Sequence, residues 1–136
     1  MSRRIARRHA CNLIFQIEFH TDFNLDEIFQ LYLDNIEEIS DIDKTFIYKE
    51  FSGVYQNLEK IDNIIEENLD GGIMYRLNKT DLAILRLAIY EIYFDKDIPD
   101  SVSINEAVEL AKEFSVGDSP SFVNGVLGNV IRSLEV

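Results

Sequence analysis

The chain has 136 residues, of which 46% are apolar, so it can bury one hydrophobic core but is too short for two ordinary domains. Its formal net charge of −12 argues against indiscriminate binding to nucleic acid, because phosphate neutralisation supplies most non-specific affinity. From this length we predict one domain over residues 1–136. The single Cys11 cannot form an internal disulfide, so we predict a cytoplasmic protein.

The first predicted helix follows Ser2, a favourable N-cap, and runs from about Arg3 to His20. Its first two turns carry four arginines, Arg3, Arg4, Arg7 and Arg8. No acidic residue occurs before Glu18, and the remainder of the chain, with 9 basic against 25 acidic residues, has a net charge of −16. We therefore expect the arginine end to project into solvent and to confine polyanion binding to that end. The alternative is a solubilising face, although cations are unfavourable near a helix N-terminus.

The next two helices are predicted from the spacing of their apolar residues. A turn over residues 21–24 leads to a helix whose apolar stripe extends from Leu25 to Ile36. A long third helix begins at Asp41 or Asp43 and continues to the glycine pair at 71–72. Gly53 lies within its apolar stripe, where glycine costs about 1 kcal/mol relative to alanine. That cost indicates a close helix contact at this position.

The most apolar helix is predicted over Leu82–Phe94, after a start at Asn78 or Thr80. Because it is apolar on nearly every side, it belongs at the centre of the fold. It is too short to span a bilayer and carries charged residues, so no membrane association is expected. Pro99 then interrupts the chain, and Ser103–Glu106 reads as a capping box that starts the next helix.

The last helix is predicted to have Ser119 as its N-cap and Pro120 as its first residue. Phe122 lies beside its apolar arc, so it could stack on an unpaired base or fill the core, and the sequence leaves both open. Gly125 and Gly128 are interpreted as close-packing positions. No segment alternates like a strand, so the fold is predicted to be an all-α bundle of about six or seven helices.

Nothing in the sequence indicates catalysis or a cofactor. His9, Cys11 and His20 lack the spacing of a zinc site, and Cys11 has no visible activating arrangement. No nucleotide-binding glycine motif is present. We therefore predict no catalytic residue, no metal and no enzymatic activity.

Three blocks of sequence resemble the NusB antitermination factors. They are Leu82–Glu91 (LAILRLAIYE) followed by Pro99, Ile104–Lys112 (INEAVELAK) and Phe122–Leu127 (FVNGVL). The arginine-rich start also matches the family, so the resemblance covers essentially the whole chain. It implies an all-helical fold and a role in transcription antitermination on ribosomal RNA transcripts, with recognition of boxA-type single-stranded RNA.

The partners implied by this resemblance are the boxA-like RNA, the ribosomal protein NusE as heterodimer partner, and the RNA polymerase antitermination complex. Some relatives form homodimers, and that state is left open here. The alternative function is a helical adaptor that binds proteins and contacts RNA only within the complex. The resemblance also strengthens an RNA-binding role for the four arginines and for Phe122. It indicates a NusE contact for Asp81, at a position where family members often carry an acid.

Overall fold

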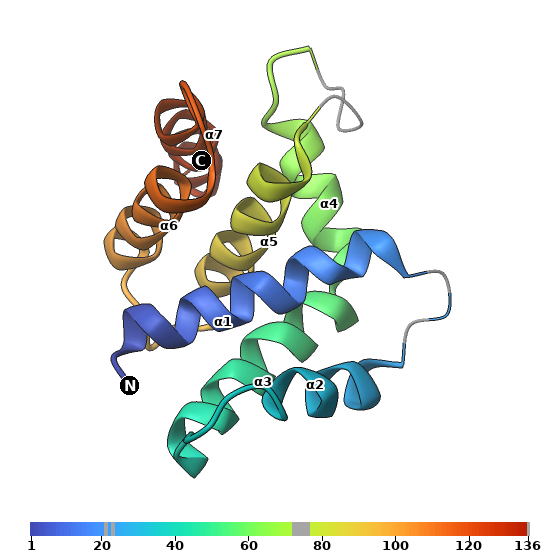
Figure 1. Cartoon of the computed structure of the whole chain (residues 1–136). Coiled ribbons are helices and arrows are strands. Elements are labelled where there is room, and N and C mark those ends of the chain that lie inside the picture. The colour runs from blue at the N-terminus through green and yellow to red at the C-terminus, as the bar shows by residue number, and fades with distance from the viewer. Residues whose placement is uncertain (21, 23, 72–76, 136) are drawn as a thin grey trace.

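Helix α5 (Lys79–Phe94) runs through the middle of a seven-helix bundle in a computed structural model that describes residues 1–20, 22, 24–71 and 77–135 (Figure 1). It packs against α1, α3, α4, α6 and α7. Residues 81–92 are all buried, because α5 has apolar side chains around nearly its whole circumference. The predicted all-α bundle and its central helix are confirmed. No helix in the described part of the chain is long and apolar enough to cross a membrane.

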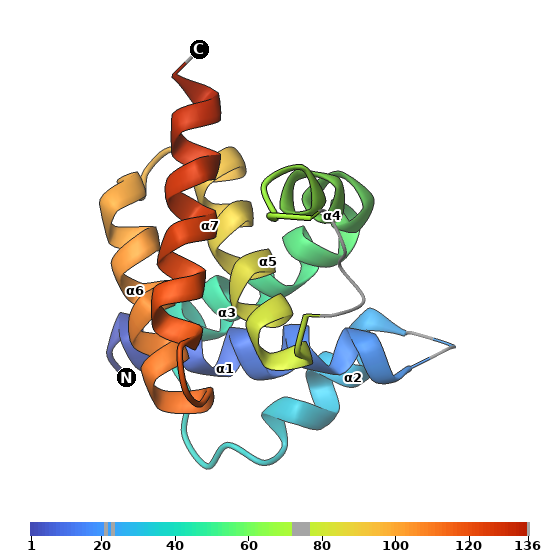
Figure 2. The ribbon, with the colours of Figure 1, turned by 90° about the horizontal axis from the view of Figure 1, so that it is seen from above.

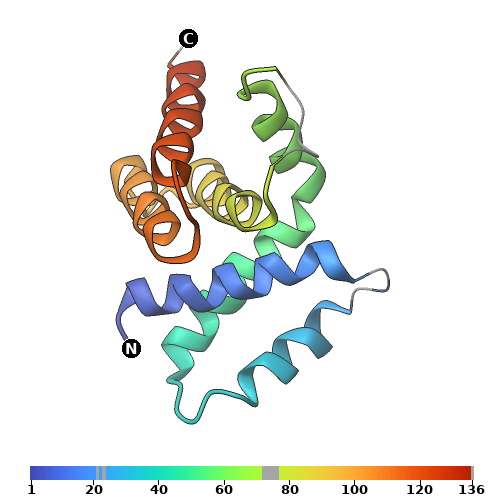
Figure 3. The ribbon, with the colours of Figure 1, turned by 45° about the horizontal axis from the view of Figure 1, so that its top comes forward.

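Helix α1 (Arg3–Gln16) lies across α5 and α3, as Figure 3 shows. The Ser2 side chain caps it by accepting a hydrogen bond from the Ile5 backbone N–H, as predicted. After Gln16 the chain tightens into a short 3-10 helix, Ile17–Phe19, so α1 is shorter than expected. The tighter winding changes the direction of the following side chains, and Phe19 is 60% exposed.

Helix α2 (Leu25–Leu33) precedes α3 (Asp41–Gln56) and α4 (Leu58–Glu67). The prediction of one long helix from Asp41 is wrong, because the chain leaves helical geometry at Asn57. The Asn57 side-chain amide donates to the Gly53 carbonyl at 2.8 Å, and such local hydrogen bonds compete with helix continuation. The predicted end at the glycine pair lies partly outside the described residues.

Helices α6 (Asp100–Phe114) and α7 (Ser119–Leu134) lie side by side against α5 (Figure 2). Both predicted N-caps are wrong. Helix α6 begins before the expected capping box, so Ser103 lies inside it, and Ser119 is the first residue of α7. Each serine hydroxyl instead donates to a buried carboxylate, Ser103 to Glu91 and Ser119 to Asp81. Buried carboxylates need such donors, and each serine supplies one from within its helix.

Of the three glycines predicted to allow close helix packing, Gly53 does so, whereas Gly125 and Gly128 do not. A Cβ at Gly53 would lie 2.2 Å from Tyr90 Cε1, so the predicted close helix contact is confirmed. The same prediction is wrong for α7: a Cβ at Gly125 meets no described atom within 4 Å, and one at Gly128 meets only the Arg132 side chain. The difference arises because α3 crosses α5 at Gly53.

Gly53→Ala should destabilise the fold by about 1–3 kcal/mol, because the added methyl group overlaps the buried Tyr90 ring. Urea unfolding of the full chain measures this change. Gly125→Ala is the matched control, and the better helix propensity of alanine should leave it as stable as the parent or up to about 1 kcal/mol more stable. A Gly53→Ala protein with unchanged or greater stability would contradict the close contact.

Candidate nucleic-acid interface

Two of the four arginines lie between α1 and α6, each beside a glutamate. The Arg4 guanidinium meets the Glu106 carboxylate through two hydrogen bonds, Nε to Oε2 at 2.9 Å and Nη2 to Oε1 at 3.2 Å. The Arg8 Nε atom lies 2.8 Å from Glu113 Oε1. The Arg4 side chain is 56% exposed and that of Arg8 is 36% exposed, so both remain accessible to a ligand.

Arg3 and Arg7 turn toward α3. The Arg3 guanidinium lies over the Phe46 ring, 4.0 Å from its centroid, which is a cation–π contact at an exposed residue. Arg7 is only 5% exposed, so the prediction that all four arginines project into solvent is wrong for this residue. Arg4 and Arg8 reach the surface because they point in another direction around the helix axis.

The Arg7 guanidinium is held by a carboxylate from the central helix. Its Nε and Nη2 atoms donate to the two Glu91 oxygens at 3.0 and 3.2 Å. The Ser103 hydroxyl donates to the same carboxylate at 2.9 Å. This buried cluster therefore connects α1, α5 and α6 through a fully hydrogen-bonded ion pair.

Glu50, from α3, completes the buried cluster. It is fully buried, and neither carboxyl oxygen has a hydrogen-bond donor among the described residues. Burial and the adjacent Glu91 carboxylate raise the pKa of Glu50 to about 9. Glu50 is therefore protonated at neutral pH and can donate its proton toward Glu91.

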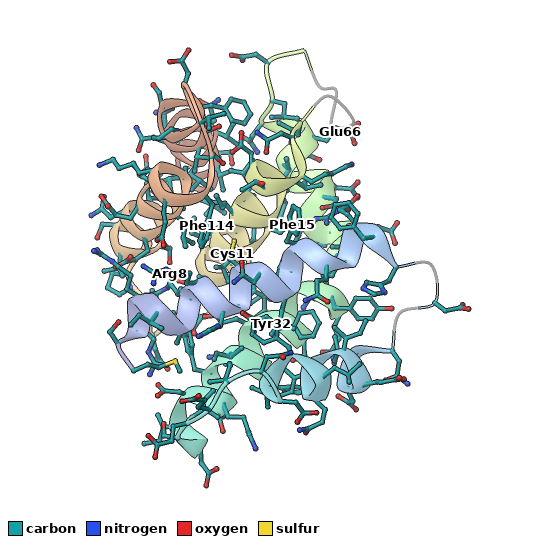
Figure 4. All side chains as sticks on the ribbon, in the orientation of Figure 1. Arg8, Cys11, Phe15, Tyr32, Glu66 and Phe114 are labelled. Atoms are coloured by element: carbon teal, nitrogen blue, oxygen red, sulfur yellow. The ribbon has the colours of Figure 1, made fainter. Side chains whose placement is uncertain are left out.

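Beside Arg8, a small hollow of about 170 Å³ opens between α1, α5 and α6. Figure 4 shows Arg8, Cys11, Phe15 and Phe114 along this side of α1. Phe15 and Phe114 line the hollow, and Phe114 is 38% exposed. The sequence analysis singled out neither ring as a surface aromatic. The signal available was their position near helix ends, where fewer neighbours cover a side chain.

Phe122 lies in a different hollow from Phe114. It is 36% exposed and lines a hollow of about 660 Å³ together with residues 68–71 after α4, Leu77 before α5 and other residues of α7. No α1 residue lines this hollow. The structure thus places Phe122 on the surface, but does not gather it with the arginines in one cavity.

Asp81 lies in the interior at the first turn of α5, and only 5% of the residue is exposed. Its carboxylate accepts hydrogen bonds from the Ser115 hydroxyl at 2.8 Å and the Ser119 hydroxyl at 3.0 Å. This burial does not fit the predicted contact of Asp81 with NusE, which requires an exposed side chain. The carboxylate instead connects the start of α5 to the turn between α6 and α7.

The other end of α1 is anchored by a second set of charges. Arg86, from α5, donates to both Asp62 oxygens at 2.8 Å and lies 2.6 Å from a Glu18 oxygen. Arg86 is 3% exposed, so these partners compensate a buried cation. They connect α4, α5 and the 3-10 helix after α1.

The residues considered for metal or nucleophilic chemistry are otherwise engaged. Burial raises the pKa of the Cys11 thiol to about 12, which suppresses its thiolate form. The His9 ring Nδ1 lies 2.8 Å from the Tyr32 hydroxyl, between α1 and α2. In the described part of the chain, no three His, Cys, Asp or Glu side chains are grouped to hold a metal ion.

Comparison with known proteins gives a consistent match. The model of the NusB family matches residues 4–132. The transcription antitermination protein NusB of Clostridium novyi (strain NT) is 44% identical over 134 residues, which cover 98% of this chain and 100% of the relative. The structure of T. maritima NusB superposes with a TM-score of 0.88 at 36% identity, covering 97% of this chain and 92% of that one.

A solved complex of the antitermination factors NusB and NusE with double-stranded RNA also contains a chain of this fold. The TM-score is 0.86 at 24% identity, with 96% of each chain covered. At that identity the likeness concerns the fold alone.

The buried Glu50 should make stability depend on pH. The folded state keeps a proton that the unfolded chain releases above its ordinary pKa of 4.5, so this stabilisation is complete below that pH. It is lost as pH rises toward 9, at up to about 1.4 kcal/mol per pH unit. Glu50→Gln is neutral at every pH, so its unfolding free energy should fall less between pH 6 and pH 8.

Urea unfolding at pH 6, 7 and 8 measures both slopes. Glu66→Gln, an exposed change on α4, provides the control and should keep the slope of the parent. Parallel slopes for the parent and Glu50→Gln would show that Glu50 is ionised in the folded state.

Proposed function

The chain belongs to the NusB family, and from this premise we propose that it is a transcription antitermination factor that acts on nascent ribosomal transcripts. It binds boxA-type single-stranded RNA as a heterodimer with NusE, within the RNA polymerase antitermination complex. It works in the cytoplasm and catalyses no reaction. The observation that carries the RNA site is the exposed arginine face of α1 on a body of net charge −16.

The exposed arginines supply the phosphate contacts. Arg3, Arg4 and Arg8 present guanidinium groups at the surface of α1, and such groups bind phosphate oxygens in a bidentate manner. Arg7 acts as a positioning residue, because its guanidinium is already satisfied by Glu91 in the interior. Phosphate contacts of this kind fix the register of the strand without reading its sequence.

Aromatic rings supply the base contacts. Phe122 is partly exposed at the start of α7, where a base can stack on its ring. Phe15 and Phe114 offer further surfaces beside Arg8.

A second candidate function is an adaptor that contacts RNA only in the complex with NusE. It is favoured by one observation: the two arginines that face α6 already have carboxylate partners in the free chain. Titration of a boxA-like RNA with and without NusE separates the two functions. Micromolar or tighter binding by the chain alone supports the first, whereas binding that requires NusE supports the adaptor.

Replacing both Arg4 and Arg8 with alanine should weaken binding of boxA-like RNA in the presence of NusE. The salt dependence should also fall, by about 0.7 in the slope of log K against log salt for each lost phosphate contact. Phe122→Ala should weaken binding without changing that slope, because stacking releases no counterion. Fluorescence anisotropy at several salt concentrations measures both quantities.

Lys60→Ala removes one cation from α4 and is the control for net charge. It should leave affinity and slope within about twofold of the parent, since Lys60 lies on α4 and the proposed phosphate contacts lie on α1. Unchanged affinity and slope for the folded Arg4/Arg8 variant would refute the arginine site.

The partner role of Asp81 is best tested with Asp81→Asn, which removes the charge and keeps the shape. Because the carboxylate is buried and accepts two serine hydroxyls, we expect a stability loss of about 1–3 kcal/mol. Calorimetric titration with NusE should then give a Kd within about twofold of the parent at a temperature where both are folded. A tenfold weaker complex would instead place Asp81 in direct contact with NusE.

A further inference from the structure

The two exposed arginine–glutamate ion pairs can separate more easily than the buried pair of Arg7 and Glu91. Arg4 and Glu106 have 56% and 18% exposed side chains, and Arg8 and Glu113 have 36% and 41%. Exposed ion pairs contribute little to stability, because water and salt compete for both partners. The Arg7 pair, by contrast, has 6% and 1% exposed side chains and cannot separate without leaving buried charges uncompensated.

The glutamates of both exposed pairs lie on the same helix. Glu106 and Glu113 lie seven residues apart on α6, and they meet Arg4 and Arg8, one turn apart on α1. Glu109, between them, pairs with Lys112 at 3.2 Å. The Glu106 carboxylate engages two nitrogens of Arg4, which is the arrangement a phosphate would use.

We propose that Glu106 and Glu113 are internal competitors for the RNA phosphates: in the free chain they occupy the phosphate-binding groups of Arg4 and Arg8, and RNA must displace them. This inference rests on the proposed RNA-binding function and adds to it two residues that lower the affinity for RNA. When a strand offers only phosphates, each arginine exchanges a glutamate contact for a phosphate contact. The two contacts are similar charge-assisted hydrogen bonds, so the exchange adds little binding free energy. Base contacts must then supply most of the affinity, so the carboxylates lower binding to every non-cognate polyanion.

The alternative role for these glutamates is positioning. If Glu106 and Glu113 hold the arginines in the geometry that RNA requires, their removal would weaken binding. Competition predicts the reverse, so the sign of the effect separates the two roles. The hydrogen bond with Glu106 is the main cause that raises the pKa of Arg4. Competition and positioning both predict this direction, so the pKa does not separate the two roles.

The test uses the full chain carrying Glu106→Gln and Glu113→Gln together. The probes are a boxA-like single-stranded RNA and an oligouridine of equal length, each titrated with and without NusE at two salt concentrations. Competition predicts that the double variant binds both RNAs roughly 2- to 30-fold more tightly, which corresponds to the loss of two exposed pairs. The gain should shrink at high salt.

A matched control removes the same charge elsewhere. Glu66→Gln with Glu67→Gln also raises the net charge by two, but these exposed residues lie on α4, and Figure 4 shows Glu66 far along the molecule from Arg8. It should change affinity less than twofold. A second control places Glu106→Gln and Glu113→Gln in an Arg4→Ala/Arg8→Ala background, where competition predicts no gain because the contested groups are absent.

The outcomes are distinct. If the parent binds RNA and the glutamine variant binds equally or more weakly, competition is overturned while the proposed function stands. A gain that persists without the arginines also overturns it, because the effect is then general repulsion. A variant that binds RNA when the parent does not supports competition in its strongest form. If neither protein binds either RNA, even with NusE, the proposed RNA-binding function itself fails, and the inference fails with it.

Discussion

The buried ion pair between Arg7 and Glu91 fixes how the first helix lies on the rest of the molecule. A buried pair of this kind is tolerated only when its remaining hydrogen-bonding groups are satisfied, and here Ser103 supplies one donor while Glu50 stays neutral. These four side chains come from four helices, α1, α3, α5 and α6. Rotation of α1 about its axis would break both hydrogen bonds between Arg7 and Glu91, so the directions of its other side chains are fixed as well.

The second ionic anchor, at Arg86, fixes α1 along its length. Glu18 follows α1 in the 3-10 helix, and Arg86 holds it together with Asp62. With one end anchored through Arg7 and the other through Glu18, α1 has a defined register against α6. That register places Phe15 and Phe114 around one small hollow, and it places the outer arginines opposite the α6 glutamates.

The ion pairs of this protein differ in how easily their partners can separate, and they differ in position accordingly. The pairs in the interior are shielded from salt and hold the helices together. The pairs at the α1–α6 edge are exposed, so they respond to salt and to competing anions. In the proposed function, the repulsive body and the α6 glutamates would together restrict binding to ligands that offer more than phosphate.

The sequence by itself determined the all-helical class, the central position of α5 and the cap at Ser2, because these depend on local spacing and nearby backbone groups. It also located the arginines. Tertiary structure alone decided the hydroxyl partners of Ser103 and Ser119 and the burial of Asp81.

The same division separates Arg7 from its neighbours on α1. All four arginines look alike in the sequence, and only the positions of α5 and α6 make one of them interior and two of them partners of glutamates more than 100 residues away. Helical periodicity reports which residues share a face, but not what lies opposite that face. The opposite surface comes from distant parts of the chain, so the charge and exposure of a site are properties of the assembled fold.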